Sequence, residues 1–288
     1  MNGIYNKPGA TMTVTGANIH DVAEHGINNK SVITITDLTV TNTGADSNSL
    51  QNNGTMTVTG AKLTGSKNHG LYNTGDLTAT DVTITNVANN GVYNDENGTI
   101  QVKELTVSAT GEHGINNASR MTAEAVKVSD TGAGKNSIQN SGTITLTGCE
   151  ISDSRNHGIY NTGTLQGEDL TITDVADNGI YNNKGQITSL TGLIISATGG
   201  QGLNNTGELV ASDVLISATG KNGVYTNGGK TTIAGLTVTD PGEHGVSNDY
   251  SGVVTLIDAT LDGSASGSNC IQNKAVMHLE NVTVKHSS

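Results

Sequence analysis

The segment Asn156-His157-Gly158-Ile159-Tyr160-Asn161 is one copy of a short sequence that recurs along the whole chain. Most copies contain a small residue, an aliphatic residue, a variable polar or aromatic residue and an asparagine. A repeat of 20 to 50 residues is typical of a solenoid, in which each coil packs against its two neighbours. The aliphatic residues of the copies lie 21 to 25 residues apart, at Ile4, Ile27, Leu50, Leu71, Val92, Ile115, Ile138, Ile159, Ile180, Leu203, Val224, Val246 and Ile271.

Between these copies the sequence alternates apolar and polar residues, which is the pattern of a half-buried strand. In the coil after Leu71 we expect strands at residues 76–80, 81–85 and 90–94. Strands stacked between successive coils are parallel, and parallel crossovers are nearly always right-handed. The sequence therefore predicts an all-β, right-handed, single-stranded parallel β-helix of about 13 coils with three short strands each, spanning residues 1–288 as one domain. The fit is poorest after Ile180, where Ile187 falls one place out of register.

One column of the repeat is almost entirely asparagine. Asparagine tolerates the left-handed backbone of tight turns, and stacked amides can bond to one another. We expect a structural Asn ladder, interrupted only at Thr226. Its members are Asn6, Asn29, Asn52, Asn73, Asn94, Asn117, Asn140, Asn161, Asn182, Asn205, Asn248 and Asn273.

The Asn column, the three strands and the coil length resemble those of pectate-lyase-like parallel β-helices. The stretch from Gly158 to Leu165 also resembles repeats of bacterial surface proteins and autotransporter passengers. These resemblances imply an extracellular or cell-surface location. They leave the activity open, because this fold hosts lyases, hydrolases, adhesins and phage tailspikes.

The net charge of −12 excludes nucleic acids and anionic membranes as expected partners, because both require basic surface, and it disfavours an acidic polysaccharide. No apolar stretch is long enough to cross a membrane. The sequence begins and stops inside a coil without a recognisable cap, so we expect a fragment of a longer protein that can associate end to end.

Acidic pairs that could serve catalysis are scarce. The adjacent pair Glu168-Asp169 lies at a predicted turn, and neighbouring coils could bring Asp169 close to Glu150 as a glycosidase pair. Scattered, solvated acids are the alternative. Cys149 and Cys270 lie several coils apart, too far for a disulfide, so we expect two separate buried thiols.

Histidine occupies the place before the small residue in every second coil. Successive histidines are two coils apart, roughly 10 Å, so two of them cannot bind one metal ion. We predict polar turn residues, no metal site and no cofactor. The histidines are His25, His69, His113, His157 and His244, and Asn48, Asn90, Asn136, Asn178 and Asn222 alternate with them, with Gln201 where a histidine is due.

Tyrosines follow the aliphatic residue in pairs of successive coils, Tyr72 with Tyr93 and Tyr160 with Tyr181. Exposed aromatic rings with amide neighbours suit sugar binding, so we predict glycan contact, with cross-strand stacking that only stabilises the sheet as the alternative. The predicted amide partners are Gln51, Gln139 and Asn116, and the small residues expected to leave the rings accessible are Gly70, Gly91, Gly158 and Gly179.

The regular repeat and the missing acidic cluster favour a non-enzymatic structural or adhesive segment of a surface or secreted protein, with glycans or a surface protein as partner. A polysaccharide lyase, glycoside hydrolase or tailspike-like enzyme is the main alternative. Rows of outward threonines, such as Thr55, Thr57 and Thr59, make ice binding a lesser alternative, although charged residues interrupt the face.

Overall fold

The computed structural model describes residues 1–263 and 268–285, and within these ranges all regular secondary structure is β-strand. The chain divides into two compact units, residues 1–145 and 146–288, which are described separately. The strand β15 (Thr143–Thr147) begins in the first unit and ends in the second.

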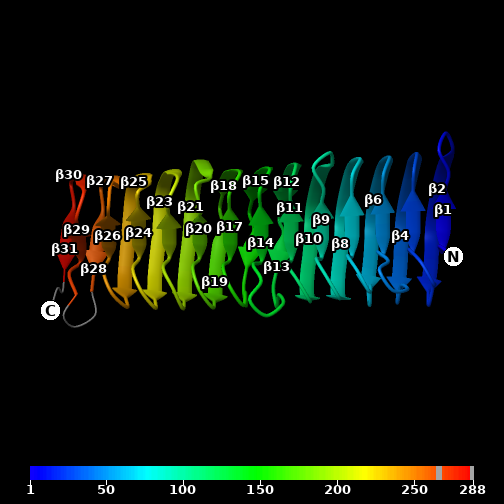
Figure 1. Ribbon diagram of the computed structural model, residues 1–288, viewed down its shortest axis with the longest axis horizontal. Coiled ribbons are helices and arrows are strands. Elements are labelled where there is room, and N and C mark those ends of the chain that lie inside the picture. Colours follow the sequence, from blue (N-terminus) through cyan, green and yellow to red (C-terminus); the bar gives the residue numbers. More distant parts are fainter. Residues whose placement is uncertain (264–267, 286–288) are drawn as a thin grey trace. The chain divides into compact units, whose positions relative to one another are not determined.

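The first unit contains a parallel sheet of three-residue strands, one for each coil (Figure 1). Aliphatic residues pair with aliphatic residues, as Ile4 does with Ile27 and Leu71 with Val92. This register confirms the repeat measured in the sequence. The strands are β1 (Ile4–Asn6), β3 (Ile27–Asn29), β5 (Leu50–Asn52), β7 (Leu71–Asn73), β9 (Val92–Asn94), β11 (Ile115–Asn117) and β14 (Ile138–Asn140).

The remainder of each coil in the first unit forms one long strand or two shorter ones. In β8 (Asp76–Val87) the two strands predicted at 76–80 and 81–85 run on without a break, and only Asp81, at φ 54°, turns the chain between them. The other strands are β2 (Thr11–His20), β4 (Val32–Thr41), β6 (Thr55–Thr64), β10 (Thr99–Thr110), β12 (Arg120–Glu124) and β13 (Lys127–Val128).

The second unit repeats this plan, with a sheet of short strands and a series of longer ones. Its short strands are β17 (Ile159–Asn161), β20 (Ile180–Asn182), β22 (Leu203–Asn205), β24 (Val224–Asn227), β26 (Val246–Asp249) and β29 (Ile271–Asn273). Its other strands are β16 (Glu150–Ile151), β18 (Thr164–Glu168), β19 (Thr171–Val175), β21 (Gln186–Thr198), β23 (Glu208–Thr219), β25 (Lys230–Pro241), β27 (Val253–Ile257), β28 (Thr260–Asp262), β30 (Val276–Glu280) and β31 (Thr283–Lys285).

The misfit at Ile187 is a β-bulge in β21. Ile187 pairs with Leu165 of β18, but the next partners are Ser189 with Gln166 and Leu190 with Gly167, so one residue is extra. A bulge inserts a single residue and leaves the flanking register intact. Gly167 accommodates the change, because a Cβ at this position would lie 2.8 Å from the Leu190 side chain.

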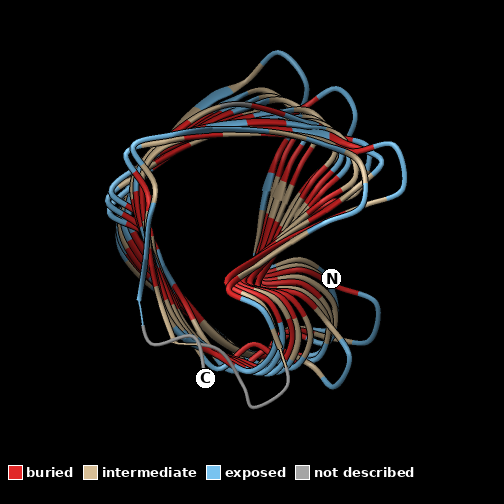
Figure 2. Ribbon diagram, turned by 90° about the vertical axis from the view of Figure 1, so that its left-hand side faces the viewer, coloured by how far each residue is buried: buried red, intermediate tan, exposed pale blue. Residues whose placement is uncertain are grey.

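The core of each unit consists of inward residues of its strands, and buried stretches recur along the ribbons in Figure 2, but β29, β30 and β31 contribute no buried residue. The inward set predicted for one coil, Leu77, Ala79, Val82, Ile84 and Val92, is buried throughout. Cys149 and Cys270 are buried free thiols, as predicted. The prediction of a right-handed parallel β-helix is confirmed, whereas the single-domain prediction remains a prediction.

The Asn ladder exists, and its members from Asn6 to Asn248 are fully buried, whereas Asn273 is exposed. In the first unit each Nδ2 donates to the Oδ1 of the next asparagine at 2.8–3.0 Å, from Asn6 through to Asn140. In the second unit the same bond joins Asn161 to Asn182 and Asn182 to Asn205. The amides also bond to turn carbonyls, so the ladder closes one turn of every coil.

The predicted backbone conformation of the ladder was wrong. None of its asparagines has a positive φ; that conformation belongs to two other corners of each coil. These corners hold mostly glycine, aspartate and asparagine, which tolerate it best. One corner column consists of Gly16, Asp37, Gly60, Asp81, Glu104 and Ala125 in the first unit and Gly148, Asp169, Gly192, Asp213, Gly235, Asp258 and Asn281 in the second.

Thr226 interrupts the ladder, and a second threonine compensates for it in part. Asn205 Nδ2 donates to the hydroxyl of Thr231 at 2.9 Å, and this hydroxyl lies 2.7 Å from that of Thr226. Thr231 occupies an inward position whose neighbours in register are Leu209 and Val254. Thr226 has no amide to donate onward, and the buried Oδ1 of Asn248 is left without a hydrogen-bond partner.

We expect the double substitution Thr226→Asn with Thr231→Leu to raise the free energy of unfolding by about 1–2 kcal/mol. It supplies a donor to Asn248 Oδ1 and restores an apolar neighbour to Leu209 and Val254. Chemical denaturation of the two proteins measures the difference. Thr231→Leu alone is the control, and it should destabilise, because it removes the partner of both Asn205 and Thr226. Equal stability of the double variant and the parent would contradict this account.

Candidate functional site

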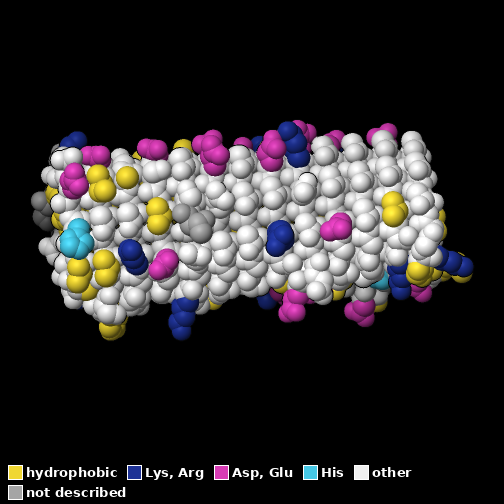
Figure 3. Space-filling model, turned by 90° about the horizontal axis from the view of Figure 1, so that it is seen from above, with side chains coloured by type: hydrophobic (Ala, Val, Ile, Leu, Met, Phe, Trp, Pro, Cys, Tyr) yellow, Lys and Arg dark blue, Asp and Glu magenta, His cyan; other side chains and the backbone are white. Residues whose placement is uncertain are grey.

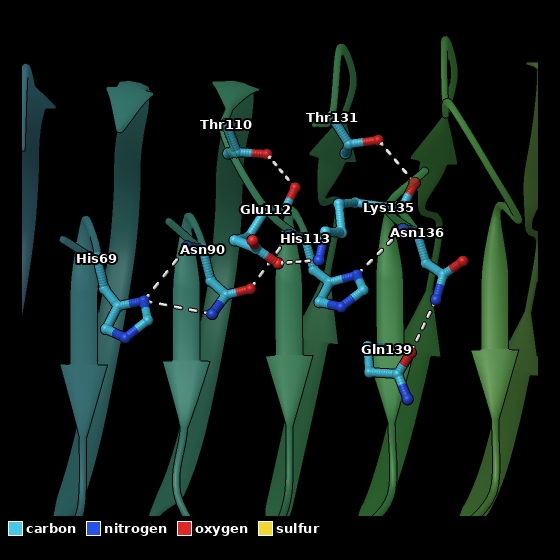
Figure 4. Close-up of polar contacts among 9 residues, drawn as sticks. All are labelled: His69, Asn90, Thr110, Glu112, His113, Thr131, Lys135, Asn136 and Gln139. Carbon is cyan, nitrogen blue, oxygen red and sulfur yellow. Dashed lines mark hydrogen bonds and ion pairs between the residues drawn. The ribbon is translucent and has the colours of Figure 1, made fainter. Parts of the chain in front are cut away.

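The histidines predicted as turn residues form a second ladder with the asparagines that alternate with them. In the first unit His69 Nδ1 accepts the backbone N–H of Asn90 at 3.2 Å, and His113 Nδ1 accepts that of Asn136 at 3.0 Å (Figure 4). Asn90 Oδ1 in turn accepts the N–H of His113 at 3.1 Å. His25 bonds to the N–H of Asn48 in the same way, at 3.0 Å. Each side chain therefore satisfies a backbone donor of the following coil.

This arrangement holds the histidines neutral. An Nδ1 that accepts a backbone N–H carries no proton, so the hydrogen-bond network assigns the Nε2–H tautomer to these rings. Burial is the main cause that lowers the pKa of His25, of His113 and of His69, where the value falls to about 4 although the charge of Glu112 opposes the change. The column is a structural element, and the sequence showed it only as an alternation of His and Asn.

Acid is expected to destabilise the fold through His69. An unfolded histidine titrates near pH 6.5, whereas folded His69 titrates near 4. Between these values the unfolded chain binds more protons, so stability is complete above pH 6.5 and falls as the pH drops toward 4. Going from pH 7 to 4.5 should cost the parent about 2 kcal/mol more than His69→Asn, which keeps a ladder acceptor but cannot titrate. Denaturant titrations at the two pH values test this, and parallel losses in both proteins would contradict it.

The predicted tyrosine pairs lie side by side, as expected for successive coils. Tyr72 and Tyr93 stack with ring centroids 5.5 Å apart and planes at 10°, and His69 stacks on both. Tyr160 and Tyr181 are 5.4 Å apart but meet edge to face at 83°. All four rings are half-buried. Because the faces of Tyr72 and Tyr93 are turned to each other, the surface of this pair that a ligand can contact consists largely of ring edges and hydroxyl groups.

The amides predicted beside these rings share the same column. Asn116 pairs with Tyr93 on one side and with Gln139 on the other. Gln139 Oε1 accepts from Asn136 Nδ2 at 2.7 Å (Figure 4). Gln51 is bonded to Asn48 and Asn53. Two of the three amides therefore already have local partners.

The glycines beside the tyrosines have a different role from the predicted one. A Cβ on Gly70 would lie 2.3 Å from Ile84 Cγ2 and 2.8 Å from the carbonyl oxygen of Gly91. Gly91, Gly158 and Gly179 are equally confined by a core side chain and the next carbonyl. Close packing of the coil requires glycine there, and the accessibility of the rings is not its reason.

The two acids of the suggested pair, Glu150 and Asp169, do not stand in register. Glu150 pairs in register with Thr171, whereas Asp169 stands in the corner column between Gly148 and Gly192 with a φ of 53°. Many other aspartates occupy corners as well, including Asp37, Asp81 and Asp213. Their abundance reflects the backbone conformation of the corners, which aspartate tolerates.

Titratable side chains converge instead on a hollow in the second unit, with a volume of about 250 Å³. It lies beside the short strands β24 and β26. Its lining is polar and includes a phenol, an imidazole, two carboxylates and an amine. The lining residues are Gln201, Lys221, Asn222, Tyr225, Glu243, His244, Ser247, Asp249 and Gln272.

Asp249 is held in place from two sides. The hydroxyl of Tyr225 donates to its Oδ2 at 3.2 Å, and Lys274 Nζ lies 2.9 Å from its Oδ1. Burial and then the Asp249 charge raise the pKa of Tyr225, so the phenol keeps its proton at neutral pH. The hydrogen bond from Tyr225 and the ion pair with Lys274 together fix the position of the Asp249 carboxylate.

The first unit also contains a Tyr–Asp hydrogen bond and a Glu-His-Gly turn, but their neighbours differ from those at the hollow. Tyr72 donates to Asp95 at 2.6 Å, as Tyr225 does to Asp249, but Asp95 has no lysine partner among the described contacts. The sequence Glu112-His113-Gly114 corresponds to Glu243-His244-Gly245, and Glu112 forms an ion pair with Lys135 (Figure 4). Glu243 and Lys221 have no ion-pair partner in the part of the chain that the structure describes.

Two other hollows are less suited to chemistry. One of about 280 Å³ in the first unit is lined by Asp37, Lys62 and Asp81, and both aspartates are corner residues. Another of about 190 Å³ contains Lys103 and Glu124, which neutralise each other at 2.8 Å. The hollow at Asp249 is therefore the candidate site.

Charge elsewhere on the surface is dispersed. On the face in Figure 3, acidic and basic side chains stand singly among uncharged polar groups. Residues 1–263 and 268–285 contain no group of three or more His, Cys, Asp or Glu side chains arranged to hold a metal ion. They also form no helix with the length and hydrophobicity that a membrane crossing requires.

The fold and the site define a class, that of parallel β-helix proteins with a polar hollow beside the sheet of short strands. No family model and no curated protein sequence matches the chain. Among solved structures it is similar to the A-module of a mannuronan C-5 epimerase from Azotobacter vinelandii, at 11% identity and a TM-score of 0.59, covering 96% of this chain and 88% of that one.

Two further structures are similar over nearly the whole chain. A mutant of a periplasmic alginate epimerase is 12% identical with a TM-score of 0.60, covering 98% of this chain and 78% of that one. The catalytic unit of a GH87 α-1,3-glucanase from Streptomyces thermodiastaticus is 14% identical with a TM-score of 0.52, covering 96% and 63%. At these identities the likeness shows the fold.

These neighbours correct the functional interpretation of the sequence. The prediction of a non-enzymatic structural or adhesive segment is contradicted, because the similar structures are carbohydrate-active enzymes, which favours the enzymatic alternative. The β-helix part of the resemblance is confirmed, and the adhesin and autotransporter context is not shown. The groups at the hollow come from several coils, from Gln201 to Gln272, so no local pattern in the sequence marks them.

Proposed function

We propose that this chain is an enzyme that acts on a polysaccharide at the hollow lined by Tyr225, Glu243, His244 and Asp249. The observation that carries the proposal is the contrast between the units. Glu112 of the turn Glu112-His113-Gly114 is neutralised by Lys135 in the first unit, whereas the turn Glu243-His244-Gly245 of the second unit borders a hollow that also contains the Asp249 carboxylate, held by Tyr225 and Lys274. Unpaired charged groups beside a concave site are candidates for catalysis.

The arrangement is suited to cleaving a glycosidic bond. Such a reaction needs a carboxylate that activates water or attacks the sugar, and an acid that protonates the leaving oxygen. Asp249, held in place by Lys274 and Tyr225, fits the first role. Glu243 and His244 supply exchangeable protons at the same hollow, and Gln201 and Gln272 can bond to sugar hydroxyls.

A polysaccharide substrate agrees with a location outside the cytoplasm. One structural neighbour is a periplasmic enzyme. We propose an extracellular or periplasmic location, and attachment to the cell surface is a more specific form of this proposal. The tyrosines 160 and 181 belong to the same unit as the hollow, and the predicted sugar contact of these rings and of Tyr72 and Tyr93 forms part of this proposal.

The test is to incubate the purified chain with a panel of neutral and acidic polysaccharides and to analyse the products by size-exclusion chromatography and by NMR at the anomeric carbon. We expect turnover of at least one polymer, and a loss of at least about 100-fold in kcat/KM on Asp249→Asn, by removal of a general base. Asp95→Asn is the matched control and should leave kcat unchanged, because Asp95 has the same tyrosine bond in the first unit but does not line the hollow.

A second matched pair tests the other side of the hollow. Glu243→Gln should lower kcat/KM, whereas Glu112→Gln, in the equivalent turn of the first unit, should not. Absence of turnover on every polymer would contradict the proposed function. Equal losses in a hollow variant and its first-unit control would show an effect on the fold and would move the site elsewhere.

A further inference from the structure

His244 differs from the ladder histidines of the first unit in the surroundings of its Nδ1. As in the other coils, this atom lies near a backbone N–H of the next coil, that of Asn269 at 3.1 Å. It also lies 2.9 Å from the carbonyl oxygen of the same residue. For His25, His69 and His113 the backbone group described at Nδ1 is an N–H donor.

This difference decides whether the ring can hold a second proton. At His69 or His113 an added Nδ1 proton would point at an N–H donor, and burial adds to the cost. The neutral ring of His244 accepts a hydrogen bond at Nδ1 from the N–H of Asn269. When Nδ1 is protonated this bond is lost, but Nδ1–H can then donate to the carbonyl oxygen of Asn269, so the charged ring still has a partner. The charged groups around the ring are Glu243 beside it in the chain and Lys221 and Asp249 in the hollow, with the neutral phenol of Tyr225.

We infer that His244 is the proton donor of the reaction, and that the Asn269 carbonyl oxygen makes this histidine, unlike its counterparts in the first unit, able to exchange a proton at Nε2. The inference rests on the proposed function, because it assigns a role in the reaction at the same hollow. Asn269 also orients the ring of His244, because its backbone groups bond to Nδ1.

The proton balance closes within the hollow. The imidazolium Nε2–H gives its proton to the leaving glycosidic oxygen as the bond from that oxygen to the anomeric carbon breaks. A water molecule gives one proton to Asp249, and its hydroxyl oxygen forms the new bond to the anomeric carbon. Transfer of the proton from Asp249 to Nε2 through solvent restores both groups.

The first measurement needs no substrate. Nitrogen-15 NMR of the labelled chain reports the tautomer and charge of each histidine. We expect the charged form of His244 to carry a proton on Nδ1, because the Asn269 carbonyl oxygen can accept its hydrogen bond, and we expect His244 to gain this proton before His113 as the pH is lowered, because Nδ1 of His113 faces the N–H of Asn136. If His113 gains an Nδ1 proton before His244, the inference is overturned.

The second measurement uses the ladder's own replacement residue. His244→Asn should fold, because asparagine fills the equivalent place in the coils on either side, at Asn222 and Asn269. We expect kcat/KM to fall at least 100-fold and the alkaline limb of the pH profile to disappear, while His113→Asn keeps both the rate and the profile. If the parent cleaves a polymer and His244→Asn cleaves it with the same pH profile, the inference fails and the proposed function stands. If the parent cleaves none, both fail.

Discussion

Replacing Asn52 by alanine is expected to lower the free energy of unfolding by about 4 kcal/mol. Asn52 Nδ2 donates to Asn73 Oδ1 at 2.8 Å and to the carbonyl oxygens of Gly54 and Asp76, both at 3.0 Å. Its Oδ1 accepts from Asn29 Nδ2 at 2.8 Å. Alanine leaves these buried groups without their partner, and each unsatisfied group costs about 1–3 kcal/mol. Urea unfolding followed by circular dichroism measures the loss.

The adjacent residue provides the control for this prediction. Asn53 is exposed and bonds through its side chain to Thr74 and Gln51, at 2.8 and 3.2 Å. Asn53→Ala should change the stability by less than about 0.5 kcal/mol, because water replaces the lost partners. Similar losses at the two positions would show that burial of the ladder is not what stabilises the coil.

Gly91→Ala is expected to be at least as damaging, with a loss of about 4 kcal/mol or failure to fold. The added Cβ would lie 2.2 Å from Val107 Cγ1 and 2.7 Å from the carbonyl oxygen of Gly114. The valine could rotate, but the carbonyl belongs to the backbone of the next coil, so the strands must separate. Soluble yield and thermal unfolding report the effect.

Gly16→Ala separates the steric clash of an added Cβ from the cost of placing a non-glycine residue in a left-handed backbone conformation. Gly16 has a φ of 66° and no atom within 4 Å of an added Cβ. Alanine there should cost only about 1 kcal/mol, from the left-handed backbone alone. Gly16→Asp should cost less than Gly16→Ala, because aspartate fills the same corner at Asp37 and Asp81. A loss at Gly16 as large as that at Gly91 would contradict the steric explanation.

Several features of the coil could be predicted because they repeat. Alternation placed Leu77, Ala79, Val82 and Ile84 in the core, and the Asn column marked the ladder. The corners were misjudged because both aspartate and asparagine suit a left-handed turn, and composition alone cannot say which column adopts it. The role of Thr231 was not predicted, because its hydroxyl group meets that of Thr226 only in the folded turn between them.

The candidate site was harder to predict, for a physical reason. The chemistry at the hollow depends on Asp249, Lys274 and Tyr225, which are far apart in the sequence and which each resemble ordinary surface residues. Their partnership depends on one coil lying on the next. Similarly, Glu112 and Glu243 stand in the same local sequence, and only the contact of Glu112 with Lys135 distinguishes them.

By itself the sequence determined the period of the coil, the inward residues and the ladder, because each of these is a local pattern repeated in every coil and stabilised by the same contacts. Only the tertiary structure decided which tyrosine faces which carboxylate, which glutamate is neutralised and which histidine has a carbonyl oxygen beside its ring. These contacts form between one coil and the next. They depend on small differences between the turns of individual coils, and a pattern shared by all coils does not contain those differences.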